Sequence, residues 1–317
     1  MAKPVNWITE YNNQIKSGKI VAGKWVKLIY AYLVEGLRKK RFYYDAEKTQ
    51  LAIDFIERFC RHSEGRSDHL TLELWQKACV AAIFGIVDKK GLRIFREVFL
   101  VVARKNGKTL FASAIIAYVK FLDGEYGAKI FCLAPKLEQA AKVYDGFYQM
   151  VLKEPALMKY LQKRRSDIYM PSTNSSTKPL AFNAKKSDGF NPHLTVCDEI
   201  ASWPAELGRK QYEVMKSALG ARSQPLILSI STAGYVNDGP YDDLMMRSTA
   251  FLLGSSDERR LLPILYIIDD VSKWDDIEEL KKSNPNLNVS VSEEYYKEEI
   301  AIARLNLSKR AEFLTKY

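Results

Sequence analysis

The sequence predicts an α/β fold in which a mainly parallel sheet is covered by helices on both faces. Short apolar runs of strand length alternate with segments of helical length and spacing through most of the chain. The run at 98–102 is continuously apolar, as expected of a strand that is covered on both sides in a parallel sheet. With 317 residues, 47% of them hydrophobic, the chain can build one large domain or two modest ones.

The predicted elements follow in chain order. Helices open the chain and are expected at 7–17, 22–35 and 45–59, before a loop at 61–68. Strands are expected at 98–102, 128–134, 194–197, 226–230 and 262–268. The helices that alternate with them are expected at 73–84, 108–122, 137–152, 206–219 and 242–253. Short charged helices follow, so the pattern divides the chain into a helical lead-in (1–70), a core (71–270) and a small lid or linker subdomain (271–317).

The composition favours a soluble, cytoplasmic protein with a polyanionic partner. The four cysteines lie far apart without a C-x-x-C pair, so neither a disulfide framework nor a structural zinc site is expected. The N-terminus has no hydrophobic signal core, and no apolar run reaches the length of a membrane span. Lysine and arginine exceed the acidic residues by 48 to 38, a net charge of +10. Cations interleaved with aromatic residues at 159–186 suit either a nucleic-acid surface or a solvated face.

The segment 99–109, Phe-Leu-Val-Val-Ala-Arg-Lys-Asn-Gly-Lys-Thr, has the order of a phosphate-binding loop. An apolar strand enters a tight turn, and a helix follows whose free N–H groups and positive dipole end favour an anion. Gly107 allows close backbone approach, the Lys108 ammonium can reach the β- and γ-phosphates, and the Thr109 hydroxyl can bind Mg²⁺. The usual pattern G-x-x-x-x-G-K-[ST] would place glycine at Val102, so a chance Gly-Lys-Thr turn is the alternative interpretation.

Two acidic residues, Asp198 and Glu199, follow the apolar run 194–197. Ligand-binding groups of open α/β sheets lie at the carboxyl ends of the strands. In a phosphate-loop ATPase the first acid supports Mg²⁺ and the second orients and deprotonates the attacking water. A strand end capped by solvated acids is the alternative, but the Gly-Lys-Thr segment upstream favours the catalytic interpretation.

Two further polar elements complete the predicted site. Ser231 and Thr232 follow the next apolar strand, where small hydroxyl side chains can sense the γ-phosphate and act as a switch. A simple Ser/Thr turn is the alternative. Upstream, Gln76 lies near the start of a helix, and its amide carries the donor and acceptor needed to read an adenine edge, although it can equally be a partly exposed helix residue.

Taken together, these elements resemble the ATPase part of tailed-bacteriophage large terminases. The segments that carry the resemblance are Trp75-Gln76, Ala103–Thr109, Cys197–Glu199, Ser231–Gly234, Trp274 and Asn284-Pro285. Terminases commonly lack the first glycine of the loop and carry a basic residue inside it, which accounts for Val102. The resemblance implies a P-loop ATPase of the additional-strand, catalytic-glutamate type.

The resemblance also implies a role for each matched residue. The residues expected to bind ATP are Gln76, Arg104, Lys105, Asn106, Gly107, Lys108 and Thr109. Thr109 and Asp198 would hold Mg²⁺, and Glu199 would be the catalytic carboxylate, with Arg104 contacting the γ-phosphate. Ser231 and Thr232 would form the coupling motif. The trans-acting cation is open, with Lys185, Lys186 and Arg222 as the candidates.

The activity implied is that of a DNA-packaging motor, in which ATP hydrolysis drives double-stranded DNA into a procapsid. The implied partners are the portal protein, the small terminase subunit and further copies of the chain in a ring, expected to be a pentamer, in the cytoplasm of an infected bacterium. The isolated chain can be a monomer. No second strand-borne acid cluster follows residue 270, so nuclease activity is not expected from this chain.

Two other classes of function compete with the motor. The first is a superfamily-2-like helicase or DNA-remodelling ATPase, whose Gln, Gly-Lys-Thr, Asp-Glu and Ser/Thr elements serve similar roles. Such an enzyme normally has a second similar lobe, and residues 271–317 are too few to build one. The second is a DNA-binding scaffold with a degenerate nucleotide site, which would show no turnover.

Overall fold

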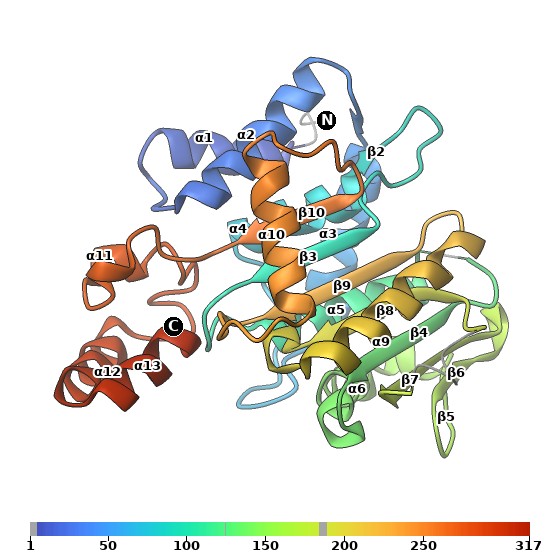
Figure 1. Ribbon diagram of the computed structural model, residues 1–317. Coiled ribbons are helices and arrows are strands. Elements are labelled where there is room, and N and C mark those ends of the chain that lie inside the picture. Colours follow the sequence, from blue (N-terminus) through green and yellow to red (C-terminus); the bar gives the residue numbers. More distant parts are fainter. Residues whose placement is uncertain (1–4, 124, 184–188) are drawn as a thin grey trace.

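The computed structural model describes residues 5–123, 125–183 and 189–317 (Figure 1). Its main sheet has eight strands in the order β10-β3-β9-β8-β4-β7-β6-β5. Their bounds, in that order, are Leu261–Leu265, Glu97–Val101, Leu226–Ser231, Pro192–Asp198, Lys129–Ala134, Ser175–Ala181, Ile168–Met170 and Gln162–Lys163. The first six run parallel to one another, whereas β6 and β5 are antiparallel to their neighbours. The predicted, mainly parallel α/β sheet is therefore confirmed.

Helices cover both faces of the sheet, because alternate strand residues point to opposite sides. In β3, Val98 and Leu100 belong to one hydrophobic cluster and Phe99 and Val101 to another. The first cluster packs against α3 (Ala46–Phe59), α4 (Leu74–Val80), α5 (Lys108–Phe121) and α6 (Leu137–Leu152). The second packs against α9 (Ala205–Ser217) and α10 (Pro240–Leu252), which lie in front of the sheet in Figure 1.

The N-terminal helices pack onto the same core as the sheet. Side chains of α1 (Trp7–Lys16), α2 (Lys24–Arg38) and α3 belong to the first hydrophobic cluster. The side chains of Asn6 and Asp45 accept backbone N–H bonds at the starts of α1 and α3, which satisfies donors that a helix leaves unpaired. A two-stranded ribbon, β1 (Tyr43–Tyr44) with β2 (Ile86–Val87), joins this part to the core.

The C-terminal helices have a hydrophobic cluster of their own. Helices α11 (Ile277–Leu280), α12 (Glu293–Leu305) and α13 (Leu307–Lys316) surround Tyr296, Ile300 and Phe313. They lie beside the carboxyl ends of the sheet strands, below α1 and α2 in Figure 1. The division of the chain near residues 70 and 270 remains a prediction. No helix among the described residues has the length and apolar character needed to cross a membrane.

The structure contains strands that the sequence pattern did not predict, and it shortens one predicted helix. The basic stretch after α7 (Pro155–Met158) forms β5, β6 and β7, which extend the sheet. Periodicity did not reveal β7 because its sequence, Ser-Ser-Thr-Lys-Pro-Leu-Ala, is mostly polar and contains a proline. The helix predicted over 73–84 ends at Val80 and continues as a π turn, Ala81–Gly85. A built Cβ at Gly85 would lie 2.0 Å from the Thr49 hydroxyl, so close packing requires glycine there.

Lys120 is a cation buried inside the fold. Its side chain lies on α5 and is 3% exposed, and its ammonium donates to the carbonyl and the hydroxyl of Ser175 at 3.4 and 3.3 Å. Burial lowers the pKa of Lys120 to about 7, further lowered by Lys129 and Arg164 and partly opposed by Asp167. The protonated amine therefore costs the fold free energy at neutral pH.

Replacing Lys120 with methionine is expected to stabilise the protein at pH 7 more than at pH 9. Between about pH 7 and the ordinary lysine pKa of about 10.4, the unfolded chain keeps a proton that the folded chain has released, so the wild-type free energy of unfolding rises with pH. The gain over these two pH units is about 2 kcal/mol, because each unit of pKa difference corresponds to about 1.4 kcal/mol. Urea unfolding at both pH values measures it, with Lys16→Met on an exposed position as the control. An equal pH dependence in wild type and Lys120→Met would contradict the prediction.

Candidate active site

The phosphate loop, the acidic pair Asp198-Glu199 and the pair Ser231-Thr232 lie at the carboxyl ends of three adjacent parallel strands. Strand β9 lies between β3, which leads into the Gly-Lys-Thr loop, and β8, which ends at Asp198. The register pairs Val101 with Ser231 and Asp198 with Ile230, so the three strands end at the same edge. The strand inserted between the phosphate-loop strand and the acidic strand is the additional strand that the fold class requires. The tertiary structure thus brings together segments that are about 90 and 30 residues apart in the chain.

The phosphate loop joins β3 to α5 through two residues with positive φ. Gly107 has φ +75° and precedes α5, and Lys105 has φ +68°. A Cβ built on Gly107 meets nothing within 4 Å, so glycine is favoured here by its backbone conformation and not by crowding. Val102 is fully buried, and its N–H donates to the Ser231 carbonyl at 3.1 Å. The position that lacks the usual glycine therefore extends the strand and fills the core.

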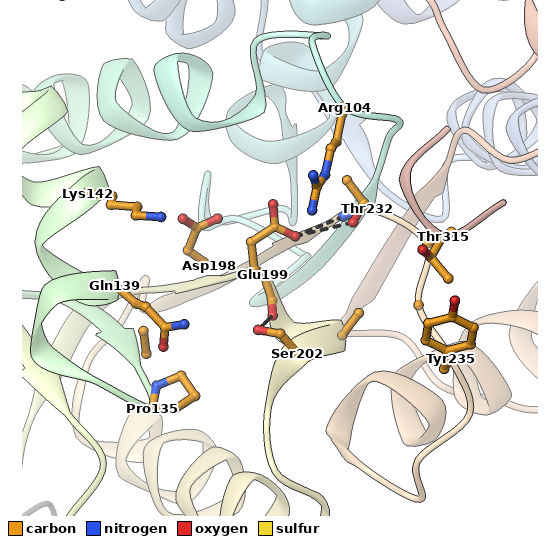
Figure 2. Close-up of a pocket in the computed structure, with 14 residues that line it drawn as sticks. Arg104, Pro135, Gln139, Lys142, Asp198, Glu199, Ser202, Thr232, Tyr235 and Thr315 are labelled. Atoms are coloured by element: carbon orange, nitrogen blue, oxygen red, sulfur yellow. Dashed lines mark hydrogen bonds between the residues drawn. The ribbon is translucent and has the colours of Figure 1, made fainter. Parts of the chain in front are cut away.

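Glu199 connects the phosphate loop to the strand β9. Its Oε1 lies 2.8 Å from the Lys108 ammonium, and its Oε2 accepts from the N–H and the hydroxyl of Thr232, each at 3.4 Å (Figure 2). Glu199 has φ +47°, a left-handed conformation that costs a non-glycine residue about 1–3 kcal/mol and recurs at functional sites. The backbone thus points this carboxylate toward Lys108 at an energetic cost.

Asp198 has the environment of a metal ligand. It is 8% exposed, and its Oδ1 has no hydrogen-bond partner among the described residues. Burial, and then the charge of Glu199, raise the pKa of Asp198 to about 6, an effect that Lys108 and Lys142 partly oppose. The unpartnered Asp198 oxygen in the first cavity and the Thr109 hydroxyl in the lining of the second are hard oxygen ligands of the kind that Mg²⁺ prefers. These residues therefore fit a Mg²⁺ ion shared with a phosphate.

No cluster of three or more histidine, cysteine, aspartate or glutamate side chains suited to a metal occurs in the described part of the chain.

Two adjoining cavities surround these groups. The first, of about 560 Å³, is lined by Arg104, Gln139, Lys142, Asp198, Glu199 and Thr232, among others. The second, of about 680 Å³, is lined by Lys105, Gly107, Lys108, Thr109, Ser113 and Lys142, among others. Both volumes lie in the range of small-molecule sites. Asp198, Glu199 and Arg104 face the first cavity, and Lys105 and Gly107–Thr109 of the phosphate loop face the second.

Of the other predicted loop residues, Arg104 and Lys105 are exposed and each lines a cavity, whereas Asn106 does not. The Asn106 side chain is 0% exposed, and its amide donates to the carbonyls of Ala103 and Arg104 at 3.1 Å and to Asn284 Oδ1 at 2.8 Å. Its Oδ1 accepts the Asn286 N–H at 2.9 Å. The prediction that Asn106 contacts ATP is therefore corrected for its side chain, which instead fastens the loop to the turn at 284–286.

The side chains of Gln76 and Ser231 each accept a hydrogen bond from a backbone N–H group. Gln76 lines neither of the two cavities, and its Oε1 accepts the Glu73 N–H at 2.9 Å as part of a capping box. Its predicted contact with adenine stays a prediction. Ser231 is fully buried, and its hydroxyl accepts the Ala201 N–H at 3.2 Å, which holds the turn after Glu199. Of the predicted coupling pair, only Thr232 lines the first cavity.

Of the three candidates for a trans-acting cation, the structure describes Arg222 alone. Arg222 precedes β9 and donates to Asn191 at 3.1 Å and to the carbonyls of Tyr126 and Gly127 at 3.0 and 2.7 Å. These groups lie near the amino ends of β8 and β4, the edge opposite the phosphate loop, and the Arg222 side chain is only 11% exposed. Arg222 is therefore an anchor within its own chain, which corrects that prediction. Lys185 and Lys186 lie outside the described residues.

Two features of the site were missed in the sequence. The first is Lys142, which lines both cavities. Helical spacing in α6 could have indicated it, because Gln139, Lys142, Gly146 and Gln149 fall on one face after a strand. The second is the role of the Asn284-Pro285-Asn286 turn, whose asparagines bind the phosphate loop and, through Asn286 Oδ1, the Trp75 indole N–H at 2.6 Å. The Asn284-Pro285 motif could be recognised in the sequence, but its contact with the phosphate loop could not.

Comparisons with known proteins identify the family and the fold. The family model "Terminase large subunit, ATPase domain" matches residues 74–248. Protein YmfN of Escherichia coli strain K12 is 35% identical over 133 residues, which cover 42% of this chain and 29% of that protein. The crystal structure of the HK97 bacteriophage large terminase shares the fold, with a TM-score of 0.69 and 23% identity over 85% of this chain and 54% of that chain. The chain thus spans about half of the HK97 protein and less than a third of YmfN. Since the family model covers more than half of its residues, this chain belongs to the family of terminase large subunit ATPase domains.

Proposed function

We propose that this chain is the ATPase motor of a DNA-packaging terminase, which couples Mg²⁺-dependent ATP hydrolysis to movement of double-stranded DNA into a procapsid. The observation that supports it most is the contact between Lys108 of the phosphate loop and Glu199 of the acidic strand, at 2.8 Å beside the buried Asp198. A loop that binds phosphate and a carboxylate that can accept a proton are thereby held in one place. Phosphoryl transfer needs this positioning more than any covalent participation by the protein.

In the proposed reaction, a water molecule attacks the terminal phosphorus, the bond to the bridging oxygen of ADP breaks, and Glu199 accepts the proton of the water. Lys108 and Arg104 stabilise the negative charge that spreads over the transferred group. Mg²⁺, held by Thr109 and Asp198, would neutralise phosphate charge when bound. Because the Lys108 ammonium would move from Glu199 to phosphate, the two donors of Thr232 would keep the glutamate oriented. The Ser231 hydroxyl, which accepts the Ala201 N–H, would hold the turn that follows Glu199.

The proposed DNA surface includes the basic stretch of β5 to β7. Lys163 and Arg164 stack over the rings of Tyr148 and Tyr169 at 5.1 and 3.9 Å, so part of their charge serves the fold. Lys159 and Arg165 are exposed at the same edge of the sheet. Exposed cations on a sheet edge suit contacts with a phosphate backbone, which are independent of sequence. The proposed partners are DNA, the portal protein, the small terminase subunit and further copies of the chain in a ring, in the cytoplasm of the host.

The direct test is to measure ATP-analogue binding and phosphate release by the purified chain, with Mg²⁺ and with EDTA, with and without double-stranded DNA. We expect binding and turnover that require Mg²⁺, and a higher rate with DNA. Absence of both binding and turnover at millimolar ATP would contradict the proposal. A plasmid-cleavage assay on the same sample is expected to be negative, since the described residues hold no cluster of three acids for a nuclease centre.

A further inference from the structure

Lys142 lies where the two cavities of the site meet. It extends from α6, is exposed, and lines both the cavity of Asp198 and Glu199 and the cavity of the phosphate loop. Figure 2 shows its side chain directed toward Asp198, while Arg104 approaches Glu199 from another side. The paired carboxylates therefore lie between two cations that come from different elements of the fold.

The distance between Lys142 and the phosphate loop is fixed by close packing of α6 on α5. The neighbouring Val143 is fully buried, and its carbonyl accepts from the Ser113 hydroxyl at 3.1 Å. One turn later, a built Cβ on Gly146 would lie 2.8 Å from the Ser113 oxygen, so glycine there lets the Ser113 hydroxyl lie between the two helices in its present position. A side chain on this face of α6 is thus held at a set distance from the start of α5.

The charges of the site leave Lys142 available to a ligand. Lys108 is paired with Glu199, whereas no carboxylate of the described residues lies within salt-bridge distance of the Lys142 ammonium. The terminal phosphate of a nucleotide must lie near both Lys108 and Glu199, which puts it at the junction of the two cavities. The negative charge of that phosphate would lie close to the negative charges of Asp198 and Glu199. A second cation at this junction would offset that repulsion.

We propose that Lys142 is a further catalytic residue, whose ammonium contacts the terminal phosphate of ATP from the α6 side. The inference rests on the proposed ATPase function and adds a group from outside the phosphate loop. Because ADP lacks that phosphate, Lys142 favours ATP over ADP in binding. Because charge on the transferred group changes during the reaction, Lys142 also raises the rate of the chemical step.

The test compares Lys142→Ala, Lys142→Arg and the control Lys136→Ala, in which an exposed lysine just before α6 is removed. Calorimetry with ADP and with the non-hydrolysable analogue AMP-PNP gives two dissociation constants for each protein. For Lys142→Ala we expect binding of AMP-PNP to weaken by about 10-fold, that of ADP to change by less than about 2-fold, and kcat without DNA to fall by about 100-fold, the size typical of a lost charge-assisted contact. Lys142→Arg is expected to recover much of both losses, and Lys136→Ala to behave as wild type.

Two results would overturn the inference. One is an equal weakening of ADP and AMP-PNP, which would indicate a general effect on the pocket. The other is an unchanged kcat without DNA combined with loss of the DNA-stimulated rate, which would make Lys142 a DNA contact. Failure of the wild-type chain to bind either nucleotide would instead contradict the proposed function itself. Since Lys142 is exposed, thermal unfolding of the variants is expected to match wild type and checks that they fold.

Discussion

Glu199→Gln is expected to lower the kcat of ATP hydrolysis by at least about 100-fold, the usual contribution of a positioned general base. Glutamine has the shape of glutamate and can still accept from Thr232, but it cannot take a proton from water. The variant also loses the ion pair with Lys108, which frees the ammonium for phosphate. Affinity for ATP is therefore expected to stay the same or to rise. Phosphate release under saturating ATP, with AMP-PNP binding by calorimetry, measures both quantities.

The control for this prediction is Glu206→Gln, which changes an exposed glutamate in the first turn of α9. It removes the same charge at a position that lines neither cavity, so kcat is expected to stay within about 2-fold of wild type, as for most surface substitutions. If Glu199→Gln hydrolysed ATP as fast as this control, Glu199 would not be the general base. If it lost nucleotide binding along with turnover, the ion pair with Lys108 would have a structural role.

Asn106→Asp is expected to destabilise the protein by about 3 kcal/mol or more, although the two side chains have the same shape. The Asn106 amide donates to three acceptors, the Ala103 and Arg104 carbonyls and Asn284 Oδ1. An aspartate would turn a second acceptor, and a buried charge, toward all of them. Urea unfolding measures the loss of stability.

The same substitution is expected to abolish ATP-analogue binding, because the loop would move away from the turn at 284–286 and a negative charge would lie beside the phosphate site. Asn306→Asp is the matched control. Asn306 is exposed and caps α13, where aspartate serves as well as asparagine, so its stability is expected to change by less than about 0.5 kcal/mol. Unchanged stability in Asn106→Asp would show that the buried network contributes nothing to the fold.

A hydrogen bond from the C-terminal helices extends this buried network. The Tyr296 hydroxyl, on α12, donates to Asn284 Oδ1, the same oxygen that accepts from Asn106. Through these two contacts a helix of the C-terminal cluster is joined to the nucleotide loop. Chains of buried hydrogen bonds specify one arrangement because each unmade bond leaves an unpaired polar group in a low dielectric. The C-terminal helices are therefore held in one position relative to the loop.

The strands and most helices of the core were predictable from the sequence, because each is marked by its own residues. The run at 98–102 is apolar throughout and the run at 226–230 is apolar except for Ser229, as two-sided burial favours, and β3 and β9 occupy nearly these positions. Strand β7 was not predictable, since polar residues with a proline give no strand period, and β5 and β6, of two and three residues, are too short to show one. They pair because β4 leaves its edge open to them.

The sequence by itself determined which family motifs the chain carries and the chemistry expected of them, and only the tertiary structure decided where each side chain lies. Gly107, Lys108, Asp198 and Glu199 were recognisable because each stands next to its own strand, within a motif of a few residues. Burial and partners depend on elements distant in the chain. They turned Asn106 inward to a turn about 180 residues away, engaged Arg222 at the opposite edge of the sheet, and brought Lys142 to the cavity junction. Local motifs therefore indicate the proposed reaction, ATP hydrolysis, whereas long-range packing sets the direction of each side chain.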